Sequence, residues 1–155
     1  MTNYEKLLDL ADQEGLDTFE LPFQAYDGLI VDDRIGIRKD MPGVQKACVL
    51  AEELGHHHTT TGNILDQSNT ENRKQELRAR VWAYNKMIGL TGLLRAYQHG
   101  CRNRFEVAEY LDVTEEFLME CLDHYRNQYG ICTKVDNYLI YFEPHLFIAD
   151  MNFGI

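Results

Sequence analysis

The stretch that says most about fold and chemistry is residues 51–58, which reads Ala51-Glu52-Glu53-Leu54-Gly55-His56-His57-His58. If this stretch is helical, Glu52 and His56 stand four residues apart on one face, with about 5–6 Å between their Cβ atoms. That spacing lets the two side chains reach one metal ion. Glu53 would lie on a neighbouring face, where a carboxylate can hold and deprotonate a metal-bound water.

The pattern is that of the H-E-x-x-H zinc peptidases with the first histidine replaced by Glu52. A carboxylate oxygen is an acceptable zinc ligand, so the replacement weakens such a site without forbidding it. The alternative is a solvated, acidic helix end followed by three exposed histidines. Isolated strings of this form are common, so the spacing by itself leaves both interpretations open.

The hydrophobic pattern around this stretch predicts helices and one small sheet. A hairpin is predicted at residues 29–38, where two apolar runs flank the turn pair Asp32-Asp33. Residues 59–70 are rich in Thr, Asn, Ser and Gly, which is typical of a loop. The predicted helices of this half cover residues 3–14, 44–57 and 71–88. The predicted core positions of the third helix are Leu77, Val81, Trp82 and Ile88.

The pattern of the second half predicts a helical module followed by a hairpin. A helix is predicted over residues 93–98, after the glycines Gly89 and Gly92. The next two predicted helices resemble a helix-turn-helix and cover residues 105–111 and 115–129. Residues 131–135 and 138–142, joined by Asp136-Asn137, are predicted to form the hairpin.

The charge of this module argues against DNA binding, which would need basic residues on the second helix. Between Phe105 and Gly130 there are seven acidic side chains and one basic side chain, Arg126. Such a segment repels phosphate groups. We therefore expect a packing module or a protein-binding face, and an acidic face could dock a basic protein such as a DNA-binding repressor.

The composition of the whole chain indicates a soluble globular protein, with 155 residues, 45% of them hydrophobic and 26% charged. The net charge of −10 disfavours nucleic acid as a partner. No apolar run approaches the ~18–20 residues that cross a bilayer, and residues 1–5 lack the features of a signal peptide. The four cysteines form no C-x-x-C pair and are expected to be reduced core thiols. We expect a cytoplasmic protein that contacts neither membrane nor nucleic acid.

The order of these elements, together with the motif, resembles the ImmA/IrrE family of metallopeptidases. Members of that family place a small sheet before an H-E-x-x-H helix and follow it with a helix that bears E-A-N-x-F-A. Residues 49–56 match the first motif at every position except Glu52, and Ala79, Trp82 and Ala83 match the alanine, aromatic and alanine of the second. The resemblance covers about residues 1–90. The sequence is similar in particular to short prophage-encoded members of the family. These members carry A-E-E-L-G-H-H and are usually found beside a phage repressor gene.

The resemblance implies a role for each matched residue. Glu53 takes the place of the catalytic glutamate, the general base for zinc-bound water. His56 takes the place of the second zinc-binding histidine, and Glu52 occupies the position of the first. The family's third ligand is the acidic residue just before the alanine of the second motif, and here that position is Arg78.

Two interpretations of Arg78 stay open. In the first, the zinc site is lost and Arg78 forms a salt bridge with Glu52, so that a cation from the second helix replaces the metal. In the second, zinc remains and the third ligand is Asp66, His57 or Glu76. Asp66 is preferred, because Glu76 stands about 200° around the helix from Arg78 and would face away from the site.

We therefore predict an α+β, helix-rich fold. A zincin-like domain with a small antiparallel sheet would cover residues 1–92, and an acidic, winged-helix-like helix-turn-helix module with a C-terminal β-hairpin would cover residues 93–155. The leading function is a zinc-dependent metallopeptidase of a prophage or mobile element. It would act as a hydrolase on a phage-type repressor whose strand adds to the edge of the N-terminal sheet.

In that function Glu53 is catalytic, and Glu52, His56 and Asp66 hold zinc. The alternative function is a metal-free pseudo-peptidase that regulates by binding a repressor or another protein. In that case Glu52 and Arg78 form the structural bridge in place of the metal.

Overall fold

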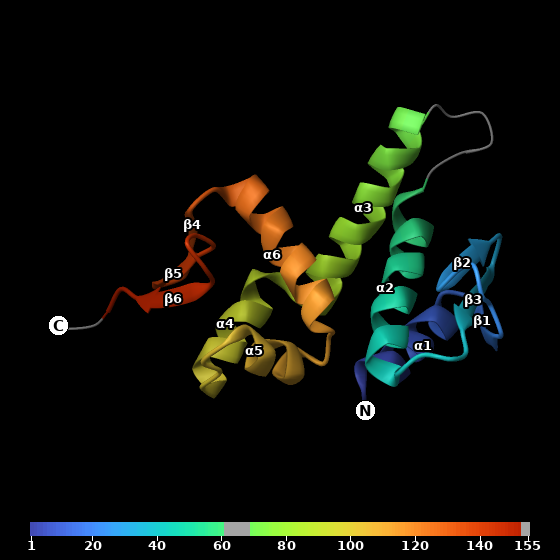
Figure 1. Ribbon diagram of the computed structural model, residues 1–155, viewed down its shortest axis with the longest axis horizontal. Helices are drawn as coiled ribbons and strands as arrows, with labels where there is room; N and C mark the ends of the chain where they lie inside the picture. The colour runs from blue at the N-terminus through green and yellow to red at the C-terminus, as the bar shows by residue number, and fades with distance from the viewer. Residues whose placement is uncertain (61–68, 153–155) are drawn as a thin grey trace. The chain divides into compact units, whose positions relative to one another are not determined.

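The computed structural model describes residues 1–60 and 69–152, with the backbone alone at residues 69 and 70. The fold is α+β and rich in helix, as predicted, and it contains two small sheets (Figure 1). The chain divides into two compact units, Met1–Lys86 and Met87–Ile155, and each is described by itself. The domain bounds expected from the sequence, residues 1–92 and 93–155, remain a prediction.

The first unit begins with helix α1 (Asn3–Gln13), which starts where the Thr2 side chain accepts a hydrogen bond from the Glu5 amide. Three short strands follow: β1 (Asp17–Leu21), β2 (Gly28–Val31) and β3 (Arg34–Arg38). β2 and β3 form the predicted hairpin, which is confirmed. Asp32 in its turn has φ 55°, the left-handed backbone that a two-residue hairpin turn requires and that aspartate tolerates better than most residues.

The sheet of the first unit is mixed rather than antiparallel, which corrects the prediction. β3 is its central strand, with β2 antiparallel on one side and β1 parallel on the other. The chain leaves β1, passes through residues 22–27, forms β2 at the far edge and returns between the two as β3. Four of the five β1 residues are exposed, so the strand lacks the alternation of apolar and polar residues from which it could have been predicted.

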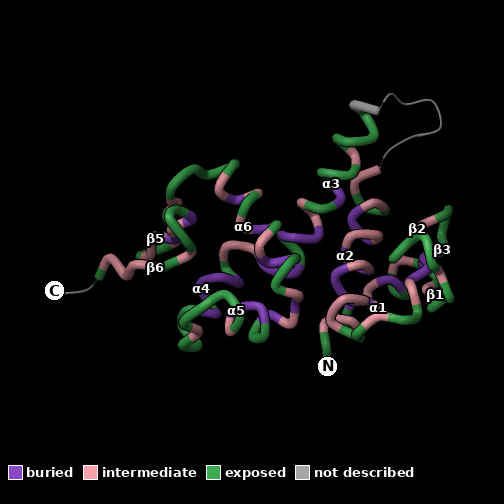
Figure 2. Tube along the Cα trace, in the orientation of Figure 1, coloured by how far each residue is buried: buried purple, intermediate pink, exposed green. Residues whose placement is uncertain are grey.

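Helix α2 (Gly43–Thr59) lies between this sheet and helix α3 (Asn69–Met87) (Figure 1). Its buried stretches (Figure 2) include Leu50 and Leu54, and they share the core of the unit with Ile35 and Ile37 of β3. The predicted helix over residues 44–57 is confirmed, with one further residue at its N-terminal end and two at its C-terminal end.

α2 and α3 approach each other closely at Gly55. A Cβ atom on Gly55 would overlap the carbonyl oxygen of Ala79 in α3. The α3 face that meets α2 therefore uses small residues, and Ala79 and Ala83 are fully buried. Leu77 was predicted to be a core residue but is 51% exposed, because it stands about 200° around α3 from Ala79 and so away from α2.

The second unit contains three helices, α4 (Gly89–His99), α5 (Arg104–Leu111) and α6 (Glu115–Tyr129). The predicted bounds of α6 are confirmed, and Thr114 Oγ1 caps the helix by accepting a hydrogen bond from the Phe117 amide at 3.0 Å. α4 begins four residues earlier than predicted. Gly92 does not break it but lies buried inside it, where a Cβ atom would stand 3.5 Å from Cδ2 of Leu111.

The second sheet is antiparallel and follows these helices. It consists of β4 (Cys132–Val135), β5 (Tyr138–Tyr141) and β6 (Phe147–Asp150), in that order. The predicted hairpin corresponds to β4 and β5 and is confirmed. The edge strand β6 extends it, because Ile148 pairs with the buried Ile140.

Cys48 and Cys121 are buried, Cys101 and Cys132 are half-buried, and all four are free thiols. Burial raises the pKa of the Cys121 thiol to about 12, which keeps it protonated. In the part of the chain that the structure describes, no helix has the length and apolarity to cross a membrane.

Candidate functional site

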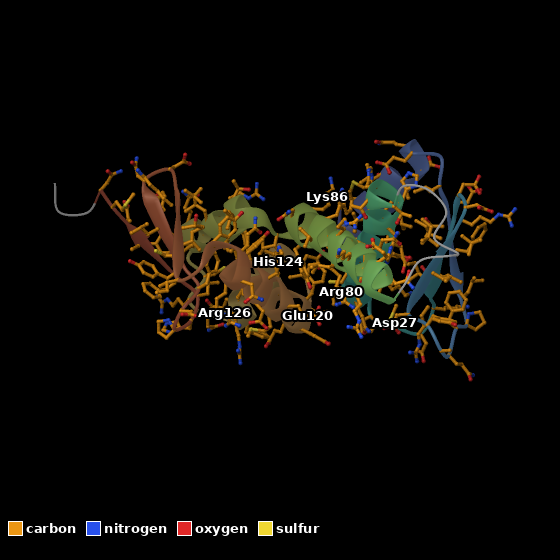
Figure 3. All side chains as sticks on the ribbon, turned by 90° about the horizontal axis from the view of Figure 1, so that it is seen from above. Asp27, Arg80, Lys86, Glu120, His124 and Arg126 are labelled. Carbon is orange, nitrogen blue, oxygen red and sulfur yellow. The ribbon has the colours of Figure 1, made fainter. Side chains whose placement is uncertain are left out.

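Helices α2 and α3 bring ionisable side chains together in two pairs. Arg80 Nε in α3 donates to Glu52 Oε1 in α2 at 3.2 Å. His56 Nε2, one turn further along α2, lies 3.4 Å from Oε1 of Glu76 in α3. Residues four apart share a helix face, so each helix presents both of its members on one side. Figure 3 labels Arg80 on α3.

The pairing of Glu52 with Arg80 corrects the predicted bridge between Glu52 and Arg78. The α3 face that meets α2 carries Glu76, Ala79, Arg80 and Ala83, which follow the spacing of one helical face. Arg78 stands about 200° around the helix from both Glu76 and Arg80 and is exposed.

The same geometry reverses the expectation for Glu76. It was predicted to face away from the site, because the motif alignment placed Arg78 on the inner face. The structure instead puts the Glu76 carboxylate against His56. The spacing of Glu76 and Arg80 around Ala79 was the signal in the sequence that would have identified both residues.

Glu53 points from α2 toward the sheet. Gly28 of β2 lies beside it there: a Cβ atom on Gly28 would stand 3.0 Å from Glu53 Oε1. Burial, and then the charges of Glu52 and Glu76, raise the pKa of the Glu53 carboxyl to about 7. Glu53 can therefore gain or lose a proton near neutral pH, as a general acid or base must. Sequence reasoning missed Gly28, and no local pattern marks it.

The other two histidines of the motif lie at a different carboxylate. His58 Nε2 is 2.9 Å from Oε1 of Glu14 at the end of α1, and His57 Nε2 is 3.9 Å from Oε2 of the same residue. The His58 ring also stacks on Trp82 of α3, with 4.7 Å between ring centroids. These contacts tie α2 to α1 and α3 and separate His57 from the Glu52–His56 face.

The fit of this site to a metal ion depends on whether three ligands converge. Within residues 1–60 and 69–152, no three His, Cys, Asp or Glu side chains lie close enough together to hold one ion. Glu52 is engaged by the guanidinium of Arg80, and His56 by Glu76. The described residues therefore do not by themselves fit a three-ligand zinc site. The predicted ligand Asp66 lies outside the described residues.

The site combines a motif of the H-E-x-x-H type with a half-buried carboxylate beside an edge strand, as expected of a metallopeptidase-like protein. A model of the family described as IrrE N-terminal-like domain matches residues 11–122. This match spans most of the chain, and the chain belongs to the ImmA/IrrE family, as its motifs predicted. Searches of curated proteins and of solved structures give no match.

Proposed function

We propose that this protein recognises an extended segment of a protein partner, a phage-type repressor, along strand β2 and beside Glu53. The closeness of Gly28 in β2 to the Glu53 carboxylate, which would leave only 3.0 Å between a Cβ atom on Gly28 and Oε1, carries the proposal. β2 is an edge strand of its sheet, so its outer side is available for an added strand. A segment bound there would pass next to Glu53.

The backbone of β2 has the geometry that strand addition needs. The Arg38 amide donates to the Asp27 carbonyl at 2.7 Å, which makes these two residues a hydrogen-bonded pair. In an antiparallel ladder such pairs alternate, so Gly28 and Ile30 direct their backbone groups to the outer edge. Hydrogen bonds to these groups would supply affinity, and neighbouring side chains would supply specificity.

We propose the metal-free form of this function as the first candidate, because Arg80 already neutralises Glu52. A guanidinium binds a carboxylate through directed hydrogen bonds and holds the helices together without a metal ion. In this form the protein is a pseudo-peptidase that regulates its partner by binding. Arg80 takes the role that the sequence suggested for Arg78.

Zinc-dependent cleavage of the same segment is the second candidate, and the approach of His56 to Glu76 favours it. A histidine and a carboxylate from facing helices are ligand types that zinc prefers. Asp66 would complete the ligand set with His56 and either Glu52 or Glu76, and Glu53 would hold the general-base position. Zinc would supply an activated water at this place.

Membership of the ImmA/IrrE family also suggests a role for each of the two units. The first unit would be a zincin-like half, and α5 and α6 a helix-turn-helix-like module that meets protein rather than DNA. The excess of acidic side chains between Phe105 and Gly130 supports a protein partner there. We propose that the protein is cytoplasmic and is encoded by a prophage or another mobile element.

The test mixes the full chain with a phage-type repressor from the same genome and measures co-elution and cleavage, with zinc and with a chelator. Ile30→Pro removes the outward amide of β2, whereas the control Ile30→Ala truncates the side chain and keeps that amide. We expect binding to survive Ile30→Ala and chelation but to be lost in Ile30→Pro. Binding that is equal in both variants would contradict strand addition.

Cleavage separates the two candidates. Repressor cleavage that needs zinc and disappears in Glu53→Gln would establish the peptidase. Stable binding without cleavage, unchanged by zinc or by Glu53→Gln, would establish the pseudo-peptidase.

A further inference from the structure

The second unit contains a cavity of about 710 Å³ among α4, α6 and the second sheet. Cavities of roughly 300–1,000 Å³ are the size that binds small molecules. Its apolar lining comes from Met119, Leu122, Phe142, Leu146, Phe147 and Ile148. All of its lining residues lie between residues 97 and 148, so it shares no residue with the site formed by α2 and α3.

Positive charge is concentrated at this cavity. Residues 87–155 carry ten acidic side chains and only five basic ones, and three of those five, Arg102, Arg104 and Arg126, line the cavity. The other two are Arg95 and Lys134. The unit has a net negative charge, so its overall composition does not account for three arginines at one cavity.

The three arginines differ in their partners. Arg126 on α6 (labelled in Figure 3) is neutralised by Asp123, with Nη2 and Oδ1 3.0 Å apart, and by Glu143 at 3.7 Å. Arg104 instead directs Nη1 to the sulfur of Met119 at 3.4 Å, a weak acceptor on the cavity wall. Within the described residues, neither Arg104 nor Arg102 forms an ion pair with a carboxylate.

A ligand that satisfies this lining must have two parts. Its body must be apolar, because the half-buried Met119, Leu122, Leu146 and Ile148 would otherwise face water or a polar group. Its head must be an anion with oxygen acceptors, because guanidinium groups bind carboxylates with directed, charge-assisted hydrogen bonds. A polyanion such as nucleic acid is disfavoured by the acidic surroundings.

We propose that this cavity binds a small amphipathic carboxylate of the medium-chain fatty acid type, with its carboxylate at Arg102 and Arg104 and its chain along Met119, Leu146 and Ile148. The second unit would then bind a small molecule at a site that is formed only by its own residues. The proposal does not depend on the strand addition proposed for β2.

The test titrates the full chain with decanoate, below the concentration at which decanoate forms micelles, and follows binding by isothermal calorimetry. Decylammonium has the same chain with a cationic head, and butyrate has the same head with a short chain. We expect saturable binding of one decanoate per chain and at least tenfold weaker binding of both other compounds. Arg104→Gln should weaken decanoate binding at least tenfold.

Arg95→Gln is the matched control, because it removes the same charge from an exposed residue of the unit that does not line the cavity. It should leave decanoate binding unchanged. Circular dichroism checks that each variant is folded, and Arg102→Gln replaces Arg104→Gln if that variant is not. Absence of saturable decanoate binding would overturn the proposal. Equal binding of decylammonium, or equal losses in Arg104→Gln and Arg95→Gln, would also overturn it.

Discussion

Nε of Arg80 lies 3.2 Å from Oε1 of Glu52, and this pair joins α3 to α2 at the place where the family motif expects a metal ion to join them. One turn away, His56 and Glu76 form the second link. The helices are thus connected at both positions by groups that the protein itself supplies. The identity of the arginine matters, because Arg78 lies two residues away and on another side of α3.

We predict that Glu52 is coupled energetically to Arg80 and not to Arg78. The Arg80 and Glu52 side chains are 51% and 33% exposed, so the coupling should be modest, about 0.5–1 kcal/mol. Urea unfolding of Glu52→Gln, Arg80→Gln and the double variant measures it as a double-mutant cycle. The same cycle with Arg78→Gln is the control and should give a coupling near zero; an equal value there would refute the assignment of Arg80.

The raised pKa of Glu53 predicts that the protein is less stable at high pH. The folded carboxyl titrates near pH 7 and the unfolded one near its ordinary value of 4.5, so between these values the folded state binds more protons. The free energy of unfolding should therefore fall as pH rises from 4.5 to about 7 and then level off, with a total loss of up to about 3 kcal/mol from this group.

Glu53→Gln should remove most of this loss. We expect the variant to be more stable than the parent at pH 8, by about 2 kcal/mol, and nearly equal to it at pH 4.5. Unfolding in urea across this pH range is the measurement. A pH profile that keeps its slope in Glu53→Gln would show that the titrating group is another residue.

Gly55→Ala should be strongly destabilising, because the added methyl group would meet the backbone carbonyl of Ala79, which cannot move aside as a flexible side chain could. We expect a loss of about 2 kcal/mol or more, despite the better helix propensity of alanine. Gly43→Ala, in the same helix, is the control, because nothing lies within 4 Å of its added Cβ atom. Its free energy of unfolding should change by less than about 0.5 kcal/mol, and equal losses would refute the close approach of α2 and α3.

Thr114→Ala should destabilise α6, because it removes the side-chain oxygen that accepts from the Phe117 amide at 3.0 Å. The expected loss is about 1 kcal/mol, and Thr114→Ser, which keeps the hydroxyl, should recover most of it. Thermal unfolding followed by circular dichroism at 222 nm measures both. If serine fails to rescue, the cap is not the source of the effect.

Elements with strong local signals were predictable from the sequence. The bounds of α6 follow from Thr114 at its start and Gly130 after its end, and the first hairpin follows from Asp32-Asp33 between two apolar runs. Elements stabilised by their neighbours were not. β1 is exposed along most of its length and exists because it pairs with β3, and α4 runs through Gly92 because Leu111 packs there.

The same division holds for the candidate site. The spacing of Glu52, Glu53 and His56 was sufficient to recognise the family, because residues four apart on a helix, such as Glu52 and His56, always share one face. It was not sufficient to choose the partners from α3. That choice depended on the rotation of α3 about its own axis, which the contact between Gly55 and Ala79 sets.

The sequence by itself determined the family, the helix that bears the motif and the α+β class, because motifs and hydrophobic periods are local properties of the chain. The tertiary structure decided which residues meet: Arg80 rather than Arg78 at Glu52, Glu76 at His56, and Gly28 at Glu53. Each of these contacts joins residues more than 15 positions apart. Their meeting depends on how closely and at what rotation two elements pack, and no local pattern of residues specifies that.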